Sequence, residues 1–301
     1  MSKSWIKQFQ KLAGGRILLD EPLSGHTTYR VGGPADVYYM PDDELDLASA
    51  LAFLRDSGIN YVVIGQGANV LFPDKGFAGC VVNTSDRFNR VSFNGQAFHA
   101  QSGVLLNSIV NECNDKGLSG FQKLAGIPGT LGGAICMNAG AFGGWISDTL
   151  QSVTFIDEEM ELVEMDKSDI GFGYRTSMFM RNPGLVITSC RFRPGKGSPE
   201  DLKAESRKIC ESRKAKQPVG QASCGSFFKN PEGNPAGELI EKAGLKGFGV
   251  GGAEISCSHA NFIVNKGTAS YSDIIELKNH IQKTIFEKFN IQLSEEVRII
   301  S

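Results

Sequence analysis

The chain has 301 residues, and its 31 Lys and Arg against 33 Asp and Glu give a formal net charge of −2, which excludes the basic field of nucleic-acid-binding proteins. No apolar run approaches the roughly 20 residues of a membrane span, and the amphipathic first fifteen residues lack the apolar core of a signal peptide. Seven irregularly spaced cysteines indicate reduced thiols rather than disulfides or a metal site, so we expect a cytoplasmic enzyme without a membrane, nucleic-acid or obligate protein partner.

The first half of the chain predicts helices alternating with short strands. A helix is expected at residues 42–57, because leucines recur on one face and Gly58 follows as a stop signal. A second helix is expected at 105–116, ending at Gly117. The expected strands lie at 61–64, 79–83, 90–93 and 97–100.

The second half adds a hairpin at 150–164, a strand at 185–192, a linker at 194–199 and a basic helix at 200–216. A long helix is expected at 271–289, with Ser270 and Asp273 as its capping box, and a terminal strand at 291–300. Mixed elements without strict strand–helix–strand alternation indicate an α+β fold.

A glycine-rich stretch at residues 126–144, GIPGTLGGAICMNAGAFGG, is the most informative part of the sequence. Seven of its nineteen residues are glycine, and because glycine loses much backbone freedom on folding, this concentration needs a physical reason. One reason is a bed on which a flat or phosphorylated cofactor lies directly against main-chain N–H groups. The alternative is a set of tightly packed turns. Pro128 and Thr130 restrict the backbone and favour the cofactor bed.

Two further glycine turns occur at 31–33 and 65–69. The strand followed by Gly65-x-Gly67 is similar to the start of a dinucleotide-binding Rossmann motif, but Val70 replaces its third glycine and Pro73 interrupts the helix that should follow. The phosphate-binding P-loop motif does not occur in the sequence. Several glycine turns that converge on one ligand suit a long cofactor with a central pyrophosphate, such as FAD, although each turn alone could be structural.

Motifs spread over nearly the whole chain resemble the UDP-N-acetylenolpyruvoylglucosamine reductase (MurB) family. In its FAD-binding half they are TTYRVGGPA at 27–35, GQGAN at 65–69 and the stretch 126–143. They continue in the family's order with FGYRTS at 172–177, GSFFKNP at 225–231 and EVRII at 296–300. The chain length and the absence of an obvious insertion after Tyr174 resemble the shorter, type II form of the family.

The resemblance implies a two-subdomain FAD-binding fold of the PCMH or vanillyl-alcohol-oxidase type, followed by a C-terminal α+β substrate domain. The expected divisions are 1–85, joined by the terminal strand 290–301, then 86–199, and a substrate domain at 200–289. The implied activity is reduction of UDP-N-acetylglucosamine enolpyruvate to UDP-N-acetylmuramate in peptidoglycan synthesis, with FAD as cofactor and NADPH as co-substrate.

The same resemblance assigns cofactor binding to the three glycine-rich segments. The assigned residues are Tyr29, Arg30, Gly32, Gly33, Gly65, Gln66, Gly67, Ala68, Asn69, Gly126, Ile127, Pro128, Gly129, Thr130, Gly132, Gly133, Asn138, Ala139 and Gly140. Ala68 departs from the serine that is common in the family, which is expected to remove one hydrogen bond to a flavin phosphate. Ser301 replaces a usual glycine, without expected consequence.

Three residues are expected to carry the chemistry. Reduction of an enol ether beside a carboxylate places hydride on C3 and negative charge on an enolate at C2. Arg175 supplies a planar cation for an enolate or carboxylate oxygen, and Glu296 polarises that group as charge develops. By the resemblance, Ser226 donates the proton to C2. Only one of Glu295 and Glu296 can face the site from a strand, and the family's Glu-Val-Arg motif selects Glu296.

Lys229, Asn230 and Lys246 are the expected contacts of the substrate's diphosphate and sugar, and Lys229 is also a candidate to support the Ser226 alkoxide. Cys224 is interpreted as a small buried residue, and His259 as a structural histidine. Two other functions stay open. One is a different flavin oxidoreductase on the same fold, such as an alcohol oxidase, and the other is a flavin- or nucleotide-sugar-binding module without turnover.

Overall fold

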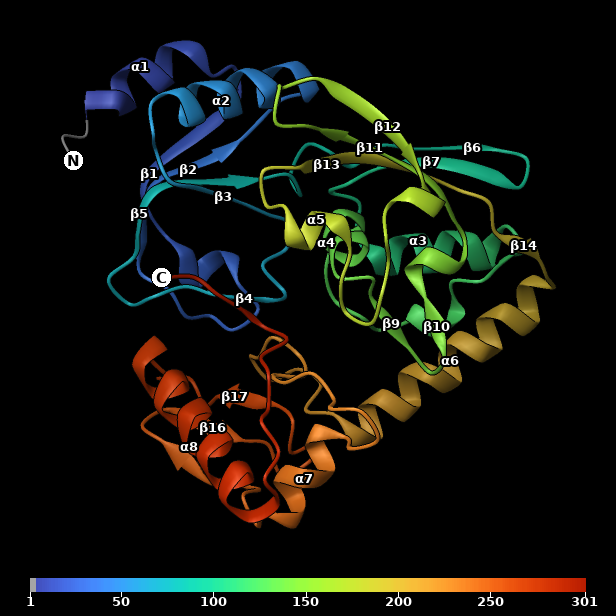
Figure 1. Ribbon diagram of the computed structural model, residues 1–301. Coiled ribbons are helices and arrows are strands. Elements are labelled where there is room, and N and C mark those ends of the chain that lie inside the picture. The colour runs from blue at the N-terminus through green and yellow to red at the C-terminus, as the bar shows by residue number, and fades with distance from the viewer. Residues whose placement is uncertain (1–3) are drawn as a thin grey trace. The chain divides into compact units, whose positions relative to one another are not determined.

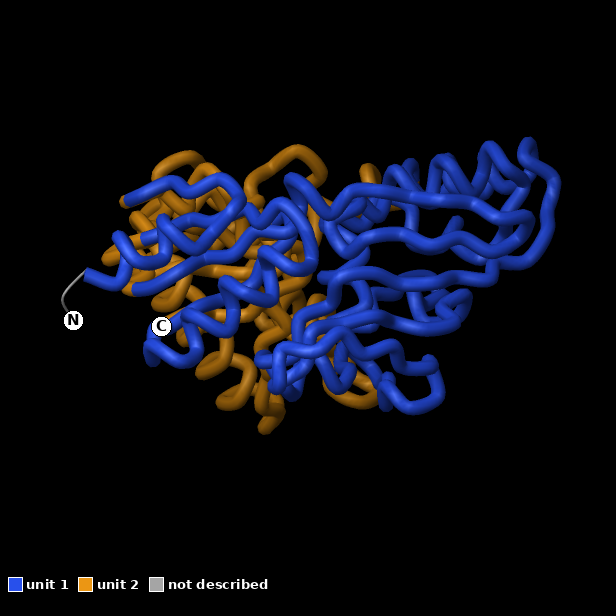
Figure 2. The backbone as a smooth tube through the Cα atoms, turned by 90° about the horizontal axis from the view of Figure 1, so that it is seen from above, with its two compact units in different colours: residues 1–19, 37–66, 79–211 blue, residues 20–36, 67–78, 212–301 orange. Residues whose placement is uncertain are grey.

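A computed structural model describes residues 4–301 (Figure 1). The chain forms two compact units, each assembled from separate stretches of sequence (Figure 2). Unit 1 comprises the chain up to residue 19 together with 37–66 and 79–211, and unit 2 comprises 20–36, 67–78 and 212–301. The division into three parts expected from the sequence, at 1–85, 86–199 and 200–289, stays a prediction, because the structure separates only these two units.

A four-stranded sheet with the order β1 (Arg16–Pro22), β2 (Pro34–Met40), β5 (Phe77–Asn83), β3 (Tyr61–Ile64) packs against helices α1 (Ser4–Leu12) and α2 (Glu44–Asp56) (Figure 1). Helix α2 confirms the helix expected at 42–57. The carboxylate of Asp43 caps it by accepting the Asp46 N–H at 2.9 Å, and Gly58 ends it in the left-handed region at φ +63°. Leu47, Leu51 and Leu54 are fully buried in a core shared with β2 and β5, whereas Leu45 is exposed.

The second sheet of unit 1 is antiparallel, with the order β12 (Leu162–Asp166), β11 (Leu150–Ile156), β13 (Val186–Phe192), β7 (Ala97–Gln101), β6 (Val91–Asn94). The pairs Phe155–Val163 and Ile156–Leu162 confirm the predicted hairpin. Side chains of the sheet share one apolar core with helices α3 (Leu106–Asp115), α4 (Leu131–Cys136) and α5 (Met178–Arg181). In Figure 1 these helices lie together on one side of the sheet.

Short elements complete unit 1. They are β8 (Leu118–Ser119), η2 (Gln122–Leu124), β9 (Gly140–Ala141), β10 (Gly144–Trp145), η3 (Ile146–Asp148), η4 (Lys167–Asp169), β14 (Gly195–Lys196) and most of α6 (Pro199–Lys216). The linker expected at 194–199 is wrong in part, because Gly195 and Lys196 pair with Ser119 and Leu118. A Cβ on Gly195 would lie 2.6 Å from the Ser119 hydroxyl oxygen, so the glycine that suggested a linker permits this close pairing instead.

Unit 2 is built around the long helix α8 (Tyr271–Phe289), which confirms the helix predicted at these residues. The hydroxyl of Ser270 and the carboxylate of Asp273 form the predicted capping box, and Ile274, Leu277 and Ile281 are fully buried. The other elements are η1 (Leu23–His26), α7 (Ala236–Lys242), the sheet β15 (Gly249–Val250), β16 (Ala253–Ile255), β17 (Ile263–Asn265), and the parallel pair β4 (Val70–Leu71) and β18 (Arg298–Ile299).

The terminal strand predicted at 291–300 is much shorter than expected, because only Arg298 and Ile299 form strand β18. The preceding residues pair with a loop instead. The Lys229 N–H donates to the Ser294 carbonyl at 2.9 Å, and the Glu296 N–H donates to the Phe227 carbonyl at 2.8 Å. The α+β class is confirmed by this mixture of helices and largely antiparallel sheets.

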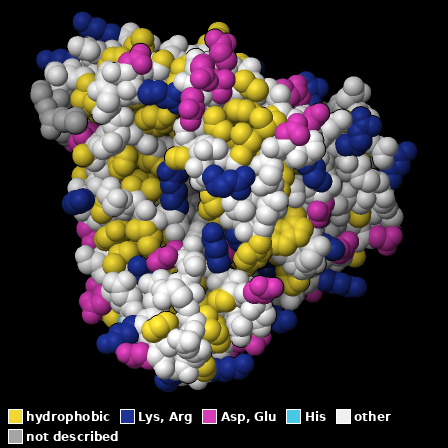
Figure 3. Space-filling view, in the orientation of Figure 1, with side chains coloured by type: hydrophobic (Ala, Val, Ile, Leu, Met, Phe, Trp, Pro, Cys, Tyr) yellow, Lys and Arg dark blue, Asp and Glu magenta, His cyan; other side chains and the backbone are white. Residues whose placement is uncertain are grey.

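Within residues 4–301, no helix is long and apolar enough to cross a membrane, and His, Cys, Asp and Glu form no cluster of three that could hold a metal ion. On the face shown in Figure 3, basic and acidic side chains are interspersed with apolar ones, in keeping with the nearly balanced composition.

Candidate active site

In unit 1, the first two residues of the glycine turn at 65–69 lie against the glycine-rich stretch at 126–144. The side-chain oxygen of Gln66 accepts the Gly129 N–H at 2.9 Å. A Cβ on Gly65 would lie only 2.1 Å from the hydroxyl oxygen of Thr130, whose side chain is buried. Two of the predicted cofactor segments therefore lie together, and glycine is needed at position 65 by the chain's own packing.

Two buried side-chain oxygens in this region form no hydrogen bond within residues 4–301. They are the Ser102 hydroxyl and the Asn138 carboxamide oxygen. Ser102 lies against Gly132, where an added Cβ would come within 2.9 Å of the Ser102 Cβ. Buried polar groups are nearly always hydrogen-bonded, so unsatisfied ones beside a glycine-rich loop fit a bound polar ligand such as FAD. Ser102 was missed from the sequence, where it follows a strand without any distinguishing motif.

In unit 2, the segments at 26–33 and 67–69 form the second group of predicted cofactor residues. The Thr28 N–H donates to the Gly67 carbonyl at 3.1 Å. A Cβ on Gly67 would lie 2.1 Å from the His26 carbonyl oxygen, and one on Gly33 equally close to the Asp74 carbonyl. At Gly33, Gly65 and Gly67, tight packing of the chain's own atoms thus accounts for glycine by itself.

Tyr29 contributes its side chain to the core of unit 2. It is 1% exposed, its hydroxyl donates to the Ile263 carbonyl at 2.9 Å, and its own carbonyl accepts from the Asn265 amide. Burial raises the pKa of this phenol well above its ordinary value. If Tyr29 contacts a cofactor, it does so through its main chain, whereas the neighbouring Arg30, at φ +55°, is exposed.

Unit 2 also brings the predicted proton donor and carboxylate onto neighbouring segments. The main-chain carbonyl of Phe227, directly after Ser226, accepts the Glu296 N–H at 2.8 Å. The side-chain amide of Asn69 donates to the Glu296 carbonyl at 3.0 Å. Ser226 and Glu296 are both half-buried. The GSFFKNP loop, the terminal segment and Asn69 of the glycine turn at 65–69 are thus joined by hydrogen bonds.

Asn261 fixes the loop that carries Ser226. Its carbonyl accepts the Phe227 N–H at 2.7 Å, and its carboxamide both accepts the Phe228 N–H at 3.0 Å and donates to the Phe228 carbonyl at 2.8 Å. Sequence reasoning had no local signal for this role, because the two segments are more than thirty residues apart.

Glu295 is bound to helix α8. Its Oε1 accepts from Lys278 Nζ at 3.0 Å and from the Gln282 amide at 3.1 Å. Burial raises the pKa of this carboxyl, but hydrogen bonds from its own N–H, Lys278 and Gln282 outweigh burial and hold the pKa below its usual value. Since Glu295 is engaged with α8, Glu296 remains the candidate for the site.

Substitution of Glu295 by alanine is expected to lower the free energy of unfolding by about 1 to 2 kcal/mol at neutral pH, because it removes a partly buried charge-assisted hydrogen bond. Because the pKa of Glu295 is lower in the folded chain than in the unfolded chain, where it is about 4.3, the ionised carboxylate stabilises the fold above that pH. This stabilisation is lost as the pH falls through the pKa of the folded chain. The difference between wild type and variant should therefore narrow below about pH 4, as measured by urea denaturation over a pH series.

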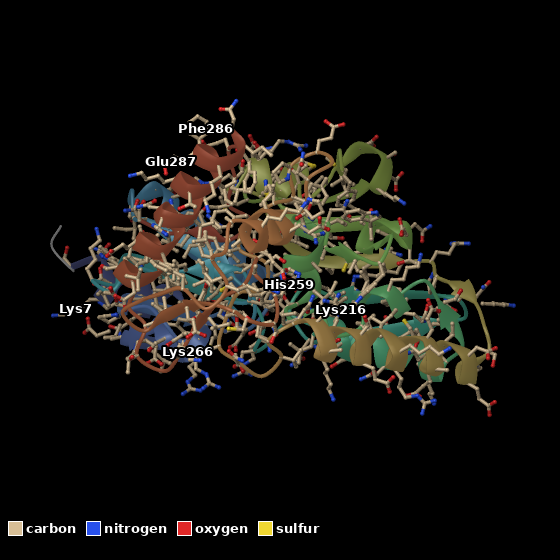
Figure 4. The ribbon with its side chains drawn as sticks, turned by 90° about the horizontal axis from the view of Figure 1, so that it is seen from below. Lys7, Lys216, His259, Lys266, Phe286 and Glu287 are labelled. Carbon is tan, nitrogen blue, oxygen red and sulfur yellow. The ribbon has the colours of Figure 1, made fainter. Side chains whose placement is uncertain are left out.

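Glu287→Ala is the matched control. Glu287 pairs with Lys283 at 3.9 Å on the exposed side of α8 (Figure 4), where its side chain is 61% exposed. This substitution should change stability by less than about 0.5 kcal/mol. An equal loss in both variants would mean that the Glu295 contacts add nothing beyond a surface charge.

Arg175 belongs to unit 1 and occupies a tight turn. The N–H groups of Gly173 and Thr176 donate to each other's carbonyls at 3.0 and 3.4 Å, which encloses Tyr174 and Arg175. The Asn138 amide, from the glycine-rich stretch, donates to the Gly173 carbonyl at 3.0 Å. The turn that carries the predicted cation is thereby attached to a predicted cofactor segment.

The predicted substrate contacts occupy unit 2. Lys246 Nζ lies 2.7 Å from Glu241 Oε1, and the side chain of Asn230 accepts the Ala236 N–H at the start of α7. Lys229 is half-buried. His259, labelled in Figure 4, accepts the Asn261 N–H through Nδ1 at 3.2 Å, and burial and nearby Lys246 lower its pKa, in keeping with a structural role.

Comparison with family models divides the chain into two regions. Residues 35–166 match the FAD binding domain, and residues 217–300 match the C-terminal domain of UDP-N-acetylenolpyruvoylglucosamine reductase. The second match contains Ser226 and Glu296, and the first contains the glycine-rich stretch.

Relatives of known name are similar over almost the whole chain. UDP-N-acetylenolpyruvoylglucosamine reductase of Clostridioides difficile (strain 630) is 40% identical over 296 residues, which are 98% of this chain and 97% of the relative. The crystal structure of MurB from Thermus caldophilus is 33% identical, with a TM-score of 0.81 over 95% of this chain and 99% of that one.

A structure of alkyldihydroxyacetonephosphate synthase, 15% identical with a TM-score of 0.50 over 65% of this chain and 41% of that one, shares the fold alone. With a shared fold, matched family domains and 40% identity over nearly its full length, the chain belongs to the UDP-N-acetylenolpyruvoylglucosamine reductase (MurB) family, whose members are FAD-dependent oxidoreductases.

Proposed function

We propose that this protein reduces UDP-N-acetylglucosamine enolpyruvate to UDP-N-acetylmuramate, with NADPH as co-substrate and with Ser226, Arg175 and Glu296 as the reacting side chains. Residues of the three glycine-rich segments would hold the cofactor, and Ser102 joins them as a further candidate because its buried hydroxyl lacks a partner within residues 4–301. FAD, when bound, supplies the hydride that is delivered to C3.

The chain's own residues complete the reduction. Hydride on C3 turns the methylene carbon into a methyl group and leaves negative charge on C2 and the adjoining carboxylate. The guanidinium of Arg175 and the carboxyl group of Glu296 stabilise this charge. The Ser226 hydroxyl then gives its proton to C2, and Lys229, three residues later, supports the resulting alkoxide until it regains a proton from solvent.

One observation supports the proposal most directly. Ser226 and Glu296 lie on segments joined by the 2.8 Å hydrogen bond between Glu296 and Phe227, and Asn69 of the glycine turn at 65–69 binds the Glu296 carbonyl. A proton donor, a carboxyl group and a predicted cofactor residue are therefore held together within unit 2. An arrangement of this kind suits protonation beside a bound flavin better than it suits binding alone.

For the UDP end of the substrate, Lys246→Ala is expected to raise KM for the enolpyruvyl sugar about tenfold while changing kcat less than twofold, since a phosphate contact made in both ground and transition state supports binding only. Steady-state kinetics at saturating NADPH measures both constants. Lys242→Ala, which removes an exposed lysine of helix α7 whose Nζ lies 3.8 Å from Glu238 Oε2, should leave both constants unchanged. An unaltered KM in the Lys246 variant would remove that residue from the site.

An anaerobic absorbance titration tests the function as a whole. The FAD-loaded protein should lose its flavin absorbance on addition of NADPH and regain it promptly on addition of UDP-N-acetylglucosamine enolpyruvate. Bleaching that reverses only with oxygen would favour the oxidase alternative. A protein that holds flavin but is never bleached would be the idle binding module.

A further inference from the structure

The side chain of Arg175 lies beside two adjoining aromatic rings in unit 1. Its Cζ is 5.6 Å from the ring centroid of Trp145 and 5.5 Å from that of Tyr174. The two rings meet edge to face, with centroids 6.1 Å apart and an interplanar angle of 89°. A guanidinium at this distance from two ring systems is attracted to both, which restricts its rotation.

The backbone of Arg175 is also unusual. Its φ of +51° lies in the left-handed region, which residues with a side chain rarely adopt, and the turn hydrogen bonds between Gly173 and Thr176 hold it there. Backbone conformation sets the direction in which the side chain leaves the turn. The aromatic rings then fix the remainder of its path.

Trp145 is itself firmly placed. It pairs with Gly140 across the hairpin β9–β10, and a Cβ on Gly140 would lie 2.2 Å from the indole Cε3, so the ring occupies the space that the glycine leaves. The carboxylate of Asp148 accepts a hydrogen bond from the main-chain N–H of Trp145 at 2.8 Å. Gly140 was assigned to the cofactor from the sequence, but its contact with Trp145 explains why this position cannot carry a side chain.

We propose that Trp145 is a positioning residue for Arg175: it holds the guanidinium in the orientation in which that group stabilises the enolate. The inference rests on the proposed role of Arg175 and adds to it a residue that stands in no motif with a known chemical role. An indole serves this purpose because its large flat face contacts the planar cation without competing for its hydrogen-bond donors.

The test is a double-mutant cycle on the FAD-loaded enzyme, followed in single-turnover stopped flow. Trp145→Ala should slow the oxidation of pre-reduced flavin by the enolpyruvyl substrate about tenfold, or 1.4 kcal/mol of barrier, with flavin reduction by NADPH within twofold of wild type. Trp145→Phe should recover most of the loss. In an Arg175→Lys background, which lacks the planar guanidinium, Trp145→Ala should cost less than twofold.

Phe286→Ala is the control, because Phe286 is an aromatic residue of helix α8, outside the glycine-rich segments, and is 51% exposed. It should leave both half-reactions unchanged. A tenfold loss on Trp145→Ala that persists in the Arg175→Lys background would overturn the proposal, since Trp145 would then act independently of Arg175.

A second readout does not depend on catalysis. The chain has two tryptophans, so Trp5→Phe leaves Trp145 as the sole indole. In that background Arg175→Lys should shift the Trp145 emission, whereas an unchanged spectrum would contradict the contact. If the emission shifts but no enolpyruvyl substrate oxidises the flavin, the contact stands and the proposed function has failed.

Discussion

Replacement of Ser226 by alanine is expected to slow the reduction of the enolpyruvyl substrate by about 10² to 10⁴-fold, roughly 3 to 5 kcal/mol of barrier, because the step loses its proton donor. Reduction of the flavin by NADPH should proceed near its normal rate, since no proton is delivered to carbon in that step. Stopped-flow absorbance measures the two half-reactions separately. Equal slowing of both would contradict a role for Ser226 as proton donor.

The structure favours a local effect of this substitution. Ser226 stands between Gly225, at φ +76°, and Phe227, whose N–H is bound by the Asn261 carbonyl. These anchors are main-chain contacts that alanine keeps. A kinetic loss without a change in the unfolding midpoint would therefore report the missing hydroxyl and not a displaced loop.

Cys224, two residues before Ser226, carries a thiol that could in principle donate a proton in place of the Ser226 hydroxyl, so its substitution is the control. Its buried Sγ donates to the Val70 carbonyl at 3.2 Å, and burial raises the pKa of the thiol to about 12. Such a group is a structural side chain. Cys224→Ala should lower stability by about 1 kcal/mol through the lost packing and hydrogen bond, and should leave both half-reactions intact.

Long elements with a regular apolar repeat could be predicted from the sequence, because their pattern directly records which face is buried. Helix α8 and the hairpin β11–β12 are examples, because both are expected from their apolar pattern and both are present. Strands β16 and β17, of three residues each, and helix α7, of seven, could not, since so few residues contain no readable period.

The division of the chain into units depends on long-range contacts. Strand β2 begins in one unit and ends in the other, and Leu71 of β4 joins the core formed by α7 and α8, which begin only at Ala236 and Tyr271. Local composition does not indicate such partners. For the same reason the terminal segment was expected to be a long strand, although its hydrogen bonds go to the GSFFKNP loop.

The candidate site was accessible to sequence reasoning only where a motif carried chemistry. Ser226 and Glu296 stand in motifs of the family, and the structure places them on adjoining segments. Trp145 and Ser102 stand in no such motif; each is identified by what lies against it, Arg175 in one case and Gly132 in the other. The glycines gave the right family but an incomplete physical reason, since several are required by the chain's own packing.

The packing around Gly67 can be tested by substitution. Gly67→Ala is expected to lower the free energy of unfolding by about 3 to 5 kcal/mol. Part of this cost is conformational, because alanine is strained at φ +65°, and part is steric, because its Cβ would stand 2.1 Å from the His26 carbonyl oxygen and 2.9 Å from the Thr27 Cα. Relief of the clash would separate the two segments that carry predicted cofactor residues, so the purified variant should also retain less FAD per chain.

Gly58→Ala separates the two contributions. Gly58 has nearly the same φ, +63°, but an added Cβ would meet no atom within 4 Å, so its substitution carries the conformational cost alone, about 1 kcal/mol. Urea denaturation monitored by circular dichroism, with flavin content from absorbance, compares the two variants. If Gly67→Ala lowers the free energy of unfolding no more than Gly58→Ala does, the segments at 26–28 and 67–69 can separate without cost. The close contact between Gly67 and His26 would then not be the reason for glycine at position 67.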